Sequence, residues 1–203
     1  MLDRHAEFGL QRVELLYHSR HMLCRDPIWT TTDGIDDMTG QRVPTGIPGL
    51  DVMLGGGFPE GRVILVMGGP GTGKTILCSQ FLHWGATKEH QKTVYISLDE
   101  TKEQYSREML GFGWDFEQLE NQGKFTFIDG SGVIRTPQQA RVGRIPVGGR
   151  ELGLVSLLDL IETHKMGARR IALDSVAGLI FRFPKVEDRR LALLDIIEGL
   201  NAT

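Results

Sequence analysis

Hydrophobic and polar positions follow one another along residues 41–203 in a pattern that predicts strands and helices in turn. Short apolar runs predict buried strands at residues 62–67, 93–98, 125–128 and 170–173. Longer segments with apolar residues at helical spacing predict helices at 72–84, from 101 to Gly111 or Gly113, at 152–165 and at 187–200. Strands that alternate with helices imply an α/β fold, in which a mostly parallel sheet is covered by helices on both faces.

The helix after the second strand has clear start and stop signals. Thr101 is followed three residues later by Gln104, which is the pattern of a capping box. Gly111 and Gly113 are both suited to end a helix. We therefore expect this helix to begin at Thr101 and to end near one of the two glycines.

Residues 1–40 form an N-terminal extension with a less defined pattern, and residues 41–203 form the α/β domain. The extension carries the formal net charge of −3, whereas basic and acidic residues balance in the domain. Residues 7–23 fit a short amphipathic helix. His18, His21 and Cys24 follow one another at spacings of three, so helical structure through all three would bring them close together. Three ligands at that spacing, without a second cluster, are a weak metal signal, so a docking helix or a loosely ordered extension is the favoured interpretation.

Composition restricts the classes of function. With 40% hydrophobic and 24% charged residues, the balance is that of a soluble globular domain. The chain contains no apolar run of about 18 residues and no secretory signal, so we expect no membrane interaction. Cys24 and Cys78 are too few for a disulfide framework, which indicates reduced thiols and a cytoplasmic location. The negative net charge argues against a protein that coats nucleic acid.

The segment Gly68–Thr75 fits the phosphate-loop pattern G-x-x-x-x-G-K-[ST], with an apolar run before it and a helical segment after it. Its glycines let backbone N–H groups face phosphates, and the helix N-terminus adds the positive end of its dipole. We expect Lys74 to contact the β- and γ-phosphates of ATP and Thr75 to ligate Mg²⁺. The expected nucleotide-binding residues are Gly68, Gly69, Pro70, Gly71, Thr72, Gly73, Lys74 and Thr75.

Carboxylates follow two of the predicted strands. Asp174 ends the fourth strand, where it is placed to hold Mg²⁺ opposite Thr75. Asp99 and Glu100 follow the second strand, where a carboxylate can orient a water molecule and accept its proton. The alternative for this pair is an acidic first turn that favours the dipole of the next helix.

An arginine-rich segment separates the third strand from the next helix. Its charged residues between Asp129 and Glu151 are Arg135, Arg141, Arg144 and Arg150. Such a flexible basic loop would suit nucleic acid at the centre of a ring, but it has no aromatic residue to stack on bases. A solvated loop, or one that pairs with acids of a neighbouring subunit, is therefore favoured.

Taken together, these motifs resemble the KaiC-like branch of the RecA-type P-loop ATPases, from about Val43 to Thr203. The matching segments are Pro44–Asp51, Leu54–Gly57, the phosphate loop, Asp99-Glu100, Gly113–Asp115, the strand at Phe125 and Asp174-Ser175. In the family the position of Asp99 and Glu100 holds a pair of catalytic glutamates. The resemblance therefore implies catalytic roles for Lys74, Asp99 and Glu100, with the main general-base role on Glu100 because Asp99 is one methylene shorter.

The resemblance also implies an activity and an assembly. It implies Mg²⁺-dependent ATP hydrolysis by a homo-oligomer, a hexameric ring in intact relatives, with a regulatory or signalling role and a regulatory protein partner. Some members phosphorylate their own Ser or Thr residues, and this activity stays open. Two other functions stay open as well: a DNA repair or recombination ATPase of the same fold, and a module in which nucleotide drives oligomerisation without efficient turnover.

One departure from the family concerns the C-terminal part of the domain. The family continues into a strand that lies between the phosphate-loop strand and the magnesium-side strand, and this strand would follow Thr203. A sheet without it leaves backbone groups unpaired. We therefore expect a domain truncated at its C-terminus, with impaired turnover.

Overall fold

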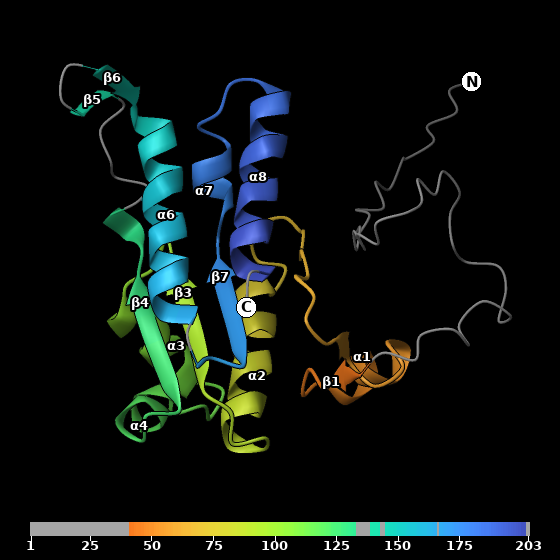
Figure 1. Ribbon diagram of the computed structural model, residues 1–203. Helices are drawn as coiled ribbons and strands as arrows, with labels where there is room; N and C mark the ends of the chain where they lie inside the picture. The colour runs from red at the N-terminus through yellow and green to blue at the C-terminus, as the bar shows by residue number, and fades with distance from the viewer. Residues whose placement is uncertain (1–40, 133–138, 143–144, 166, 202–203) are drawn as a thin grey trace, which may run out of the picture.

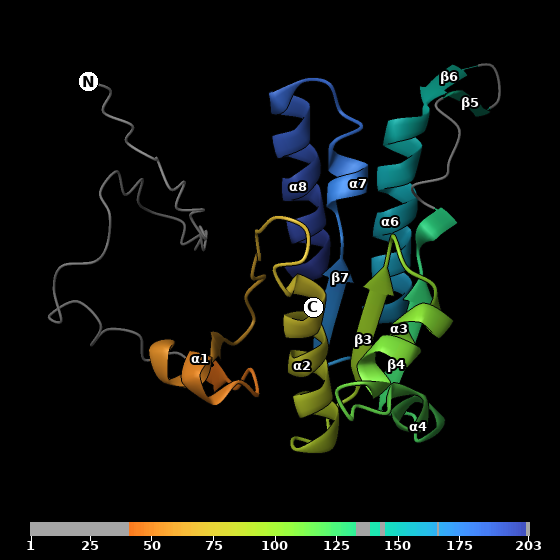
Figure 2. The same ribbon diagram turned by 180° about the vertical axis from the view of Figure 1, so that it is seen from behind.

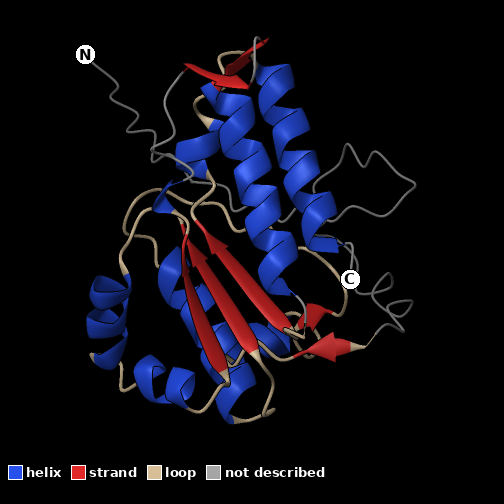
Figure 3. Cartoon of the chain, turned by 60° about the vertical axis from the view of Figure 1, so that its left-hand side comes forward, coloured by secondary structure: helices blue, strands red, loops and turns tan. Residues whose placement is uncertain are grey.

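The computed structural model describes residues 41–132, 139–142, 145–165 and 167–201. At its centre is a parallel sheet with the strand order β4–β3–β7 (Figures 1 and 3). The strands are β3 (Thr93–Ser97), β4 (Phe125–Asp129) and β7 (Arg170–Asp174). The register of the central strand places Tyr95 opposite Phe127 on one side and opposite Ala172 on the other.

Helices cover both faces of this sheet (Figures 1 and 2). One face packs against α2 (Lys74–Thr87), α3 (Lys102–Leu110) and α4 (Phe116–Asn121). The other face packs against α6 (Gly149–Lys165), α7 (Ala177–Ile180) and α8 (Val186–Asn201). The predicted α/β class, with a parallel sheet between two helical layers, is confirmed.

Strand β3 divides the hydrophobic core into two halves. Every residue of this strand is buried. Because successive side chains of a strand point to opposite faces, Val94 and Ile96 join the cluster under α6, α7 and α8. Tyr95 joins the cluster under α2, α3 and α4. Burial of each large apolar side chain contributes about 1.5–3 kcal/mol to folding, and this strand contributes to both layers.

The predicted start and end of α3 are confirmed. The Thr101 hydroxyl accepts the backbone N–H of Gln104 at 3.4 Å, and the Gln104 side chain accepts the backbone N–H of Thr101 at 3.1 Å. The helix ends at Leu110 with Gly111 as its C-cap. The capping box satisfies two N–H groups that the first helical turn leaves without intrahelical partners.

The strand expected at residues 62–67 is absent, which corrects the sequence prediction. This apolar run is irregular and half-exposed, and its backbone forms no hydrogen bond with any other described residue. The reason is the lack of a partner, because within the described chain β7 pairs only with β3. An apolar run satisfies the side-chain requirement of a buried strand, but a strand also needs a neighbour for its N–H and C=O groups.

Smaller elements complete the described chain. Strands β1 (Arg42–Val43) and β2 (Phe58–Pro59) form an antiparallel pair on either side of α1 (Pro48–Met53). Strands β5 (Gln139–Val142) and β6 (Ile145–Gly148) form an antiparallel hairpin before α6.

This hairpin occupies part of the segment that we expected to be a flexible loop. Arg141 lies in β5 and Arg150 in the first turn of α6, whereas Arg135 and Arg144 lie outside the described residues. The proposed helix at 7–23 and the possible ligands His18, His21 and Cys24 also lie outside them.

Candidate functional site

The phosphate-loop residues turn directly into α2. Gly71 and Gly73 have positive φ angles of 75° and 87°, a conformation that residues with a Cβ atom rarely adopt. Gly73 is the N-cap of α2 in the left-handed conformation, so the helix begins at Lys74. The loop from Gly68 to Thr75 thus lies at the N-terminus of a 14-residue helix, where the helix dipole favours an anion.

Lys74 lies across its own loop. Its Nζ donates hydrogen bonds to the backbone oxygens of Gly68 at 3.0 Å and Gly69 at 2.8 Å. The Thr72 hydroxyl donates to the same Gly69 oxygen at 2.9 Å. The ammonium group is therefore satisfied by the backbone, and phosphate oxygens would replace these carbonyls as its partners.

Thr75 and Asp174 meet, as the sequence predicts for a magnesium site. The Thr75 hydroxyl donates to Oδ2 of Asp174 at 2.5 Å, although the two residues are 99 positions apart. The register explains this contact. Tyr95 lies opposite Ala172 and Ser97 opposite Asp174, and alternate residues of a strand share a face. Asp174 is therefore on the same face as Ala172, and that face packs against α2.

Glu100 is held by the turn that follows β3. The Ser97 hydroxyl donates to the backbone oxygen of Glu100 at 2.8 Å and accepts the Glu100 N–H at 2.9 Å. The Glu100 atom Oε2 is buried and has no hydrogen-bond partner among the described residues. Burial raises the pKa of this carboxyl, and the negative charges of Glu108, Asp174 and Asp99 raise it further. A carboxylate with a raised pKa is a stronger base than a carboxylate with the ordinary pKa, so it accepts a proton more readily.

Asp99 is exposed and differs from Glu100 in its contacts. Its Oδ2 accepts a hydrogen bond from the Ser175 hydroxyl at 2.8 Å. This bond joins the residues that follow β3 and β7, so Asp99 links two strand ends. Both carboxylates of the Asp99-Glu100 pair thus lie beside Asp174 at the same end of the sheet.

The donor set of this site fits a magnesium ion accompanied by phosphates. Mg²⁺ is usually bound by one or two carboxylates together with waters and substrate phosphates, rather than by an all-protein cage. A hydroxyl and a carboxylate are already in contact at Thr75 and Asp174. In the part of the chain that the structure describes, no group of three or more His, Cys, Asp or Glu could hold a metal ion.

Two residues of the site were missed by sequence reasoning. Ser97 shapes the turn that carries Glu100, and the Tyr95 hydroxyl donates to Oδ2 of Asp174 at 3.0 Å. Both residues are buried and belong to the apolar run of β3, Tyr95 at its centre and Ser97 at its end. The hydroxyl groups of Tyr95 and Ser97 were the signal that could have identified them from the sequence, because a buried hydroxyl needs a hydrogen-bond partner.

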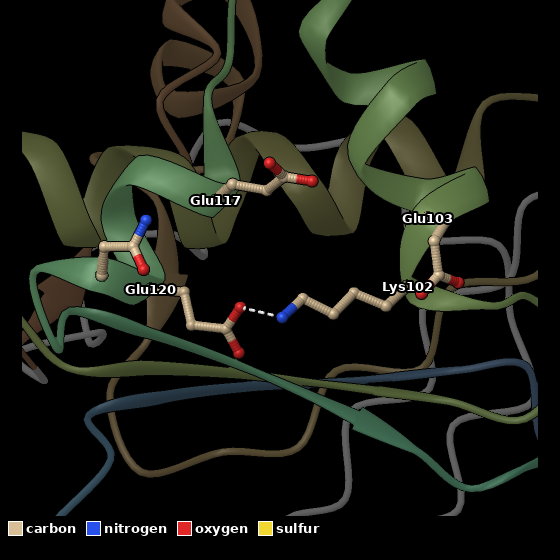
Figure 4. A pocket seen from close by; sticks show the side chains of 5 residues that line it. Lys102, Glu103, Glu117 and Glu120 are labelled. Atoms are coloured by element: carbon tan, nitrogen blue, oxygen red, sulfur yellow. Dashed lines mark ion pairs between the residues drawn. The ribbon is translucent and has the colours of Figure 1, made fainter.

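A pocket of about 270 Å³ lies elsewhere, between α3 and α4 (Figure 4). It is lined by Lys102, Glu103, Glu117, Glu120 and Asn121. Lys102 forms an ion pair with Glu120, and the other two glutamates leave the lining negative. This charge would repel phosphates, so the pocket does not compete with the loop at Gly68–Thr75 as a nucleotide site.

Comparison with known proteins connects this geometry with a family. Residues 43–203 match the family model described as "ATPase: KaiC". A UPF0273 protein of Methanocaldococcus jannaschii is 40% identical over 80% of this chain and 68% of its own length. The circadian clock protein KaiC3 of a Synechocystis strain is 40% identical over 74% of this chain and 27% of its own length.

Comparison with a solved structure also shows similarity to a KaiC-like protein. The crystal structure of a KaiC-like protein from Pyrococcus horikoshii is 33% identical and aligns with a TM-score of 0.60, covering 79% of this chain and 67% of that one. The chain spans between 58% and 68% of the length of the curated UPF0273 relatives that it matches, for example 65% of the one from Aeropyrum pernix. No described helix combines the length and apolar character needed to cross a membrane.

Proposed function

Because this chain belongs to the KaiC family of ATPases, we propose that it binds ATP with Mg²⁺ at Gly68–Thr75 and hydrolyses it with Glu100 as the general base. The observation that carries the proposal is the hydrogen bond between Thr75 and Asp174. It joins the phosphate loop to the end of the sheet, where Glu100 is also held.

The residues have separate roles in this reaction. Lys74 and the N–H groups of the loop bind the phosphates, and Thr75 and Asp174 would hold Mg²⁺, which supplies positive charge at the phosphate oxygens. Glu100 orients a water molecule and accepts its proton as the water oxygen bonds to the γ-phosphorus. The bond from the γ-phosphorus to its bridging oxygen then breaks, which gives ADP and inorganic phosphate. Asp99, held by Ser175, contributes negative charge and supports the strand end that carries Glu100.

The charge balance of the site supports the requirement for a cation. Asp99, Glu100 and Asp174 lie together at the end of the sheet, and the loop joined to it through Thr75 supplies Lys74, so carboxylates outnumber the ammonium group. A nucleotide triphosphate would add further negative charge to this arrangement. Mg²⁺ would reduce that repulsion, so we expect ATP to bind more tightly with the ion than without it.

The test of the proposal is the variant Lys74→Ala, with Lys88→Ala at the exposed C-terminal end of the same helix as control. Removing a charged hydrogen-bond donor costs about 1.5–3 kcal/mol, so Lys74→Ala should weaken binding of a fluorescent ATP analogue roughly 10- to 100-fold. Lys88→Ala should bind like the parent chain. Equilibrium titration with Mg²⁺ present measures both, and parent-like binding by Lys74→Ala would disprove the proposed site.

The family relationship also supports a regulatory role and self-assembly, which we include in the proposal. The similarity to a circadian clock protein supports the first. Exposed apolar side chains on and near α7 and α8 support the second, because Phe181 is 71%, Val186 69% and Leu191 60% exposed. In the second candidate function, nucleotide drives this assembly without turnover. Sedimentation with and without Mg²⁺·ATP, together with phosphate release, distinguishes it from the ATPase.

Self-phosphorylation is a separate activity that stays open for this chain. Incubation with ATP labelled at the γ-phosphate would distinguish it from hydrolysis. Label that stays on the protein reports transfer to Ser or Thr, and label released as inorganic phosphate reports hydrolysis.

A further inference from the structure

Oδ2 of Asp174 receives two hydrogen bonds from different parts of the fold. The Thr75 hydroxyl of α2 donates to it at 2.5 Å and the Tyr95 hydroxyl of β3 at 3.0 Å. Among the described residues, Oδ1 of the same carboxylate accepts no hydrogen bond. The carboxylate is thus fixed through one oxygen, and its other oxygen keeps its full capacity as an acceptor.

The Tyr95 hydroxyl is a rigid donor. Tyr95 is 1% exposed, and its ring packs against Tyr105 at a centroid distance of 4.3 Å and against Phe127 at 5.7 Å. Because the ring cannot turn without disturbing this packing, the position of the hydroxyl is set by the folded sheet.

We propose that Tyr95 is a positioning residue for the magnesium side of the ATP site, and that it orients the Asp174 carboxylate before nucleotide binds. This inference rests on the proposed function, because it assigns Asp174 to Mg²⁺. When the Thr75 hydroxyl coordinates a metal ion through an oxygen lone pair, the position of this donor is set by the ion as well as by Asp174. The bond from Tyr95 does not depend on the ion, so it keeps the carboxylate in place. Partners that orient a metal ligand in this way typically account for 10- to 100-fold in metal affinity.

The chain offers a closely matched pair of variants for the test. Tyr95→Phe removes the hydroxyl and keeps the ring in the aromatic cluster. Tyr105→Phe removes a buried hydroxyl from the neighbouring ring, which lies beside Ser79 and donates no hydrogen bond to Asp174. A general effect of losing a buried hydroxyl would appear in both variants, whereas an effect through Asp174 would appear only in Tyr95→Phe.

The experiment is a magnesium titration of fluorescent ATP-analogue binding to the full 203-residue chain, with binding in excess chelator measured separately. We expect Tyr95→Phe to raise the Mg²⁺ concentration at half-maximal binding roughly tenfold and to leave binding in chelator unchanged. Tyr105→Phe should match the parent chain in both measurements. Thermal unfolding without nucleotide confirms that each variant is folded.

Each result has a defined consequence. An unchanged Mg²⁺ midpoint in Tyr95→Phe would overturn the inference and leave the proposed ATP site intact. Equal shifts in both variants would also overturn it, because the effect would then come from the aromatic cluster. If the parent chain binds the ATP analogue equally well with and without Mg²⁺, and Lys74→Ala binds it as tightly as the parent chain does, the proposed function is disproved.

Discussion

At the level of single residues, ionisation of Glu100 favours its proposed role as a base but lowers the stability of the fold. Its Oε2 is buried without a partner, and burial together with Glu108, Asp174 and Asp99 raises the pKa of its carboxyl. The folded chain therefore binds this proton more tightly than the unfolded chain does. Stability contributed by the protonated carboxyl is present at low pH and is lost as pH rises through the raised pKa. At neutral pH Glu100 has to be ionised to act as a base, and this partly buried negative charge destabilises the folded chain.

The substitution Glu100→Gln should separate these two effects. It should reduce phosphate release by about 100-fold or more while Mg²⁺·ATP binding is retained. It should also raise the melting temperature at pH 8, and this difference should shrink as pH falls through the pKa of Glu100. Phosphate-release assays and melting curves from pH 5 to pH 8 measure the two effects.

Glu103→Gln is the matched control for this prediction. Glu103 lies three residues further on in the first turn of α3, and it is exposed. Its substitution should leave phosphate release and the pH dependence of melting unchanged. Hydrolysis at the parent rate in Glu100→Gln would remove Glu100 from the catalytic role.

At the level of elements, Arg170 at the start of β7 connects three segments of the fold. Its side chain is 2% exposed and donates to the backbone oxygens of Pro44 at 2.8 Å and Phe81 at 2.9 Å, and to the Gln91 side chain at 2.7 Å. The guanidinium also lies over the Phe81 ring, 4.5 Å from its centroid. Burial lowers the pKa of Arg170, which shows the cost of holding this charge away from water.

Replacement of Arg170 should therefore destabilise the domain more than replacement of its neighbour. Arg170→Met leaves carbonyl oxygens inside the fold without their donor, and we expect a loss of about 2–4 kcal/mol in the free energy of unfolding. Arg169→Met removes an exposed side chain that reaches Glu60 at 3.4 Å. This substitution should change the free energy of unfolding by less than about 0.5 kcal/mol. Urea unfolding curves test both, and similar losses in the two variants would contradict the role of Arg170.

At the level of the whole molecule, most of the fold could be predicted from the sequence. The strands at β3, β4 and β7 have buried apolar runs, and α3 has an explicit capping box, so local pattern and final structure agree. The same local logic located Lys74, Thr75 and Asp174, because each lies at the end of an element that the pattern defines. The local pattern sets the position of each residue within its own element, and the sequence records this directly.

What could not be predicted depends on how distant segments pair. The hydrogen bond from Tyr95 to Asp174 spans 79 positions, and it exists because the register of β3 and β7 places the two residues on one face. The apolar pattern of β3 gives no sign of that register. The run at 62–67 shows the converse, since its residues suit a strand but no described strand lies beside it. Pairing is a property of the assembled sheet rather than of a segment.

This difference between apolar character and pairing leads to a prediction for hydrogen exchange. Amides of β3 are hydrogen-bonded between two strands in a buried layer, so they should exchange only when much of the domain opens. Amides at 63–67 have no partner among the described residues, and should exchange faster by orders of magnitude despite their apolar side chains. Strand β4 is the internal control, because among the described residues it pairs with β3 alone, so its exchange should be intermediate.

The same hydrogen-exchange measurement can be repeated with nucleotide bound. The run at 62–67 leads directly into the phosphate loop, so Mg²⁺·ATP bound at Lys74 should slow exchange within 68–75 most strongly and should slow 63–67 less. Lys74→Ala should remove this protection. Protection of 63–67 to the level of β3 before nucleotide is added would mean that this segment pairs as a strand in solution. In that case the open side of β7 would be closed by a partner, and the sheet would hold Asp174 from both sides rather than from β3 alone.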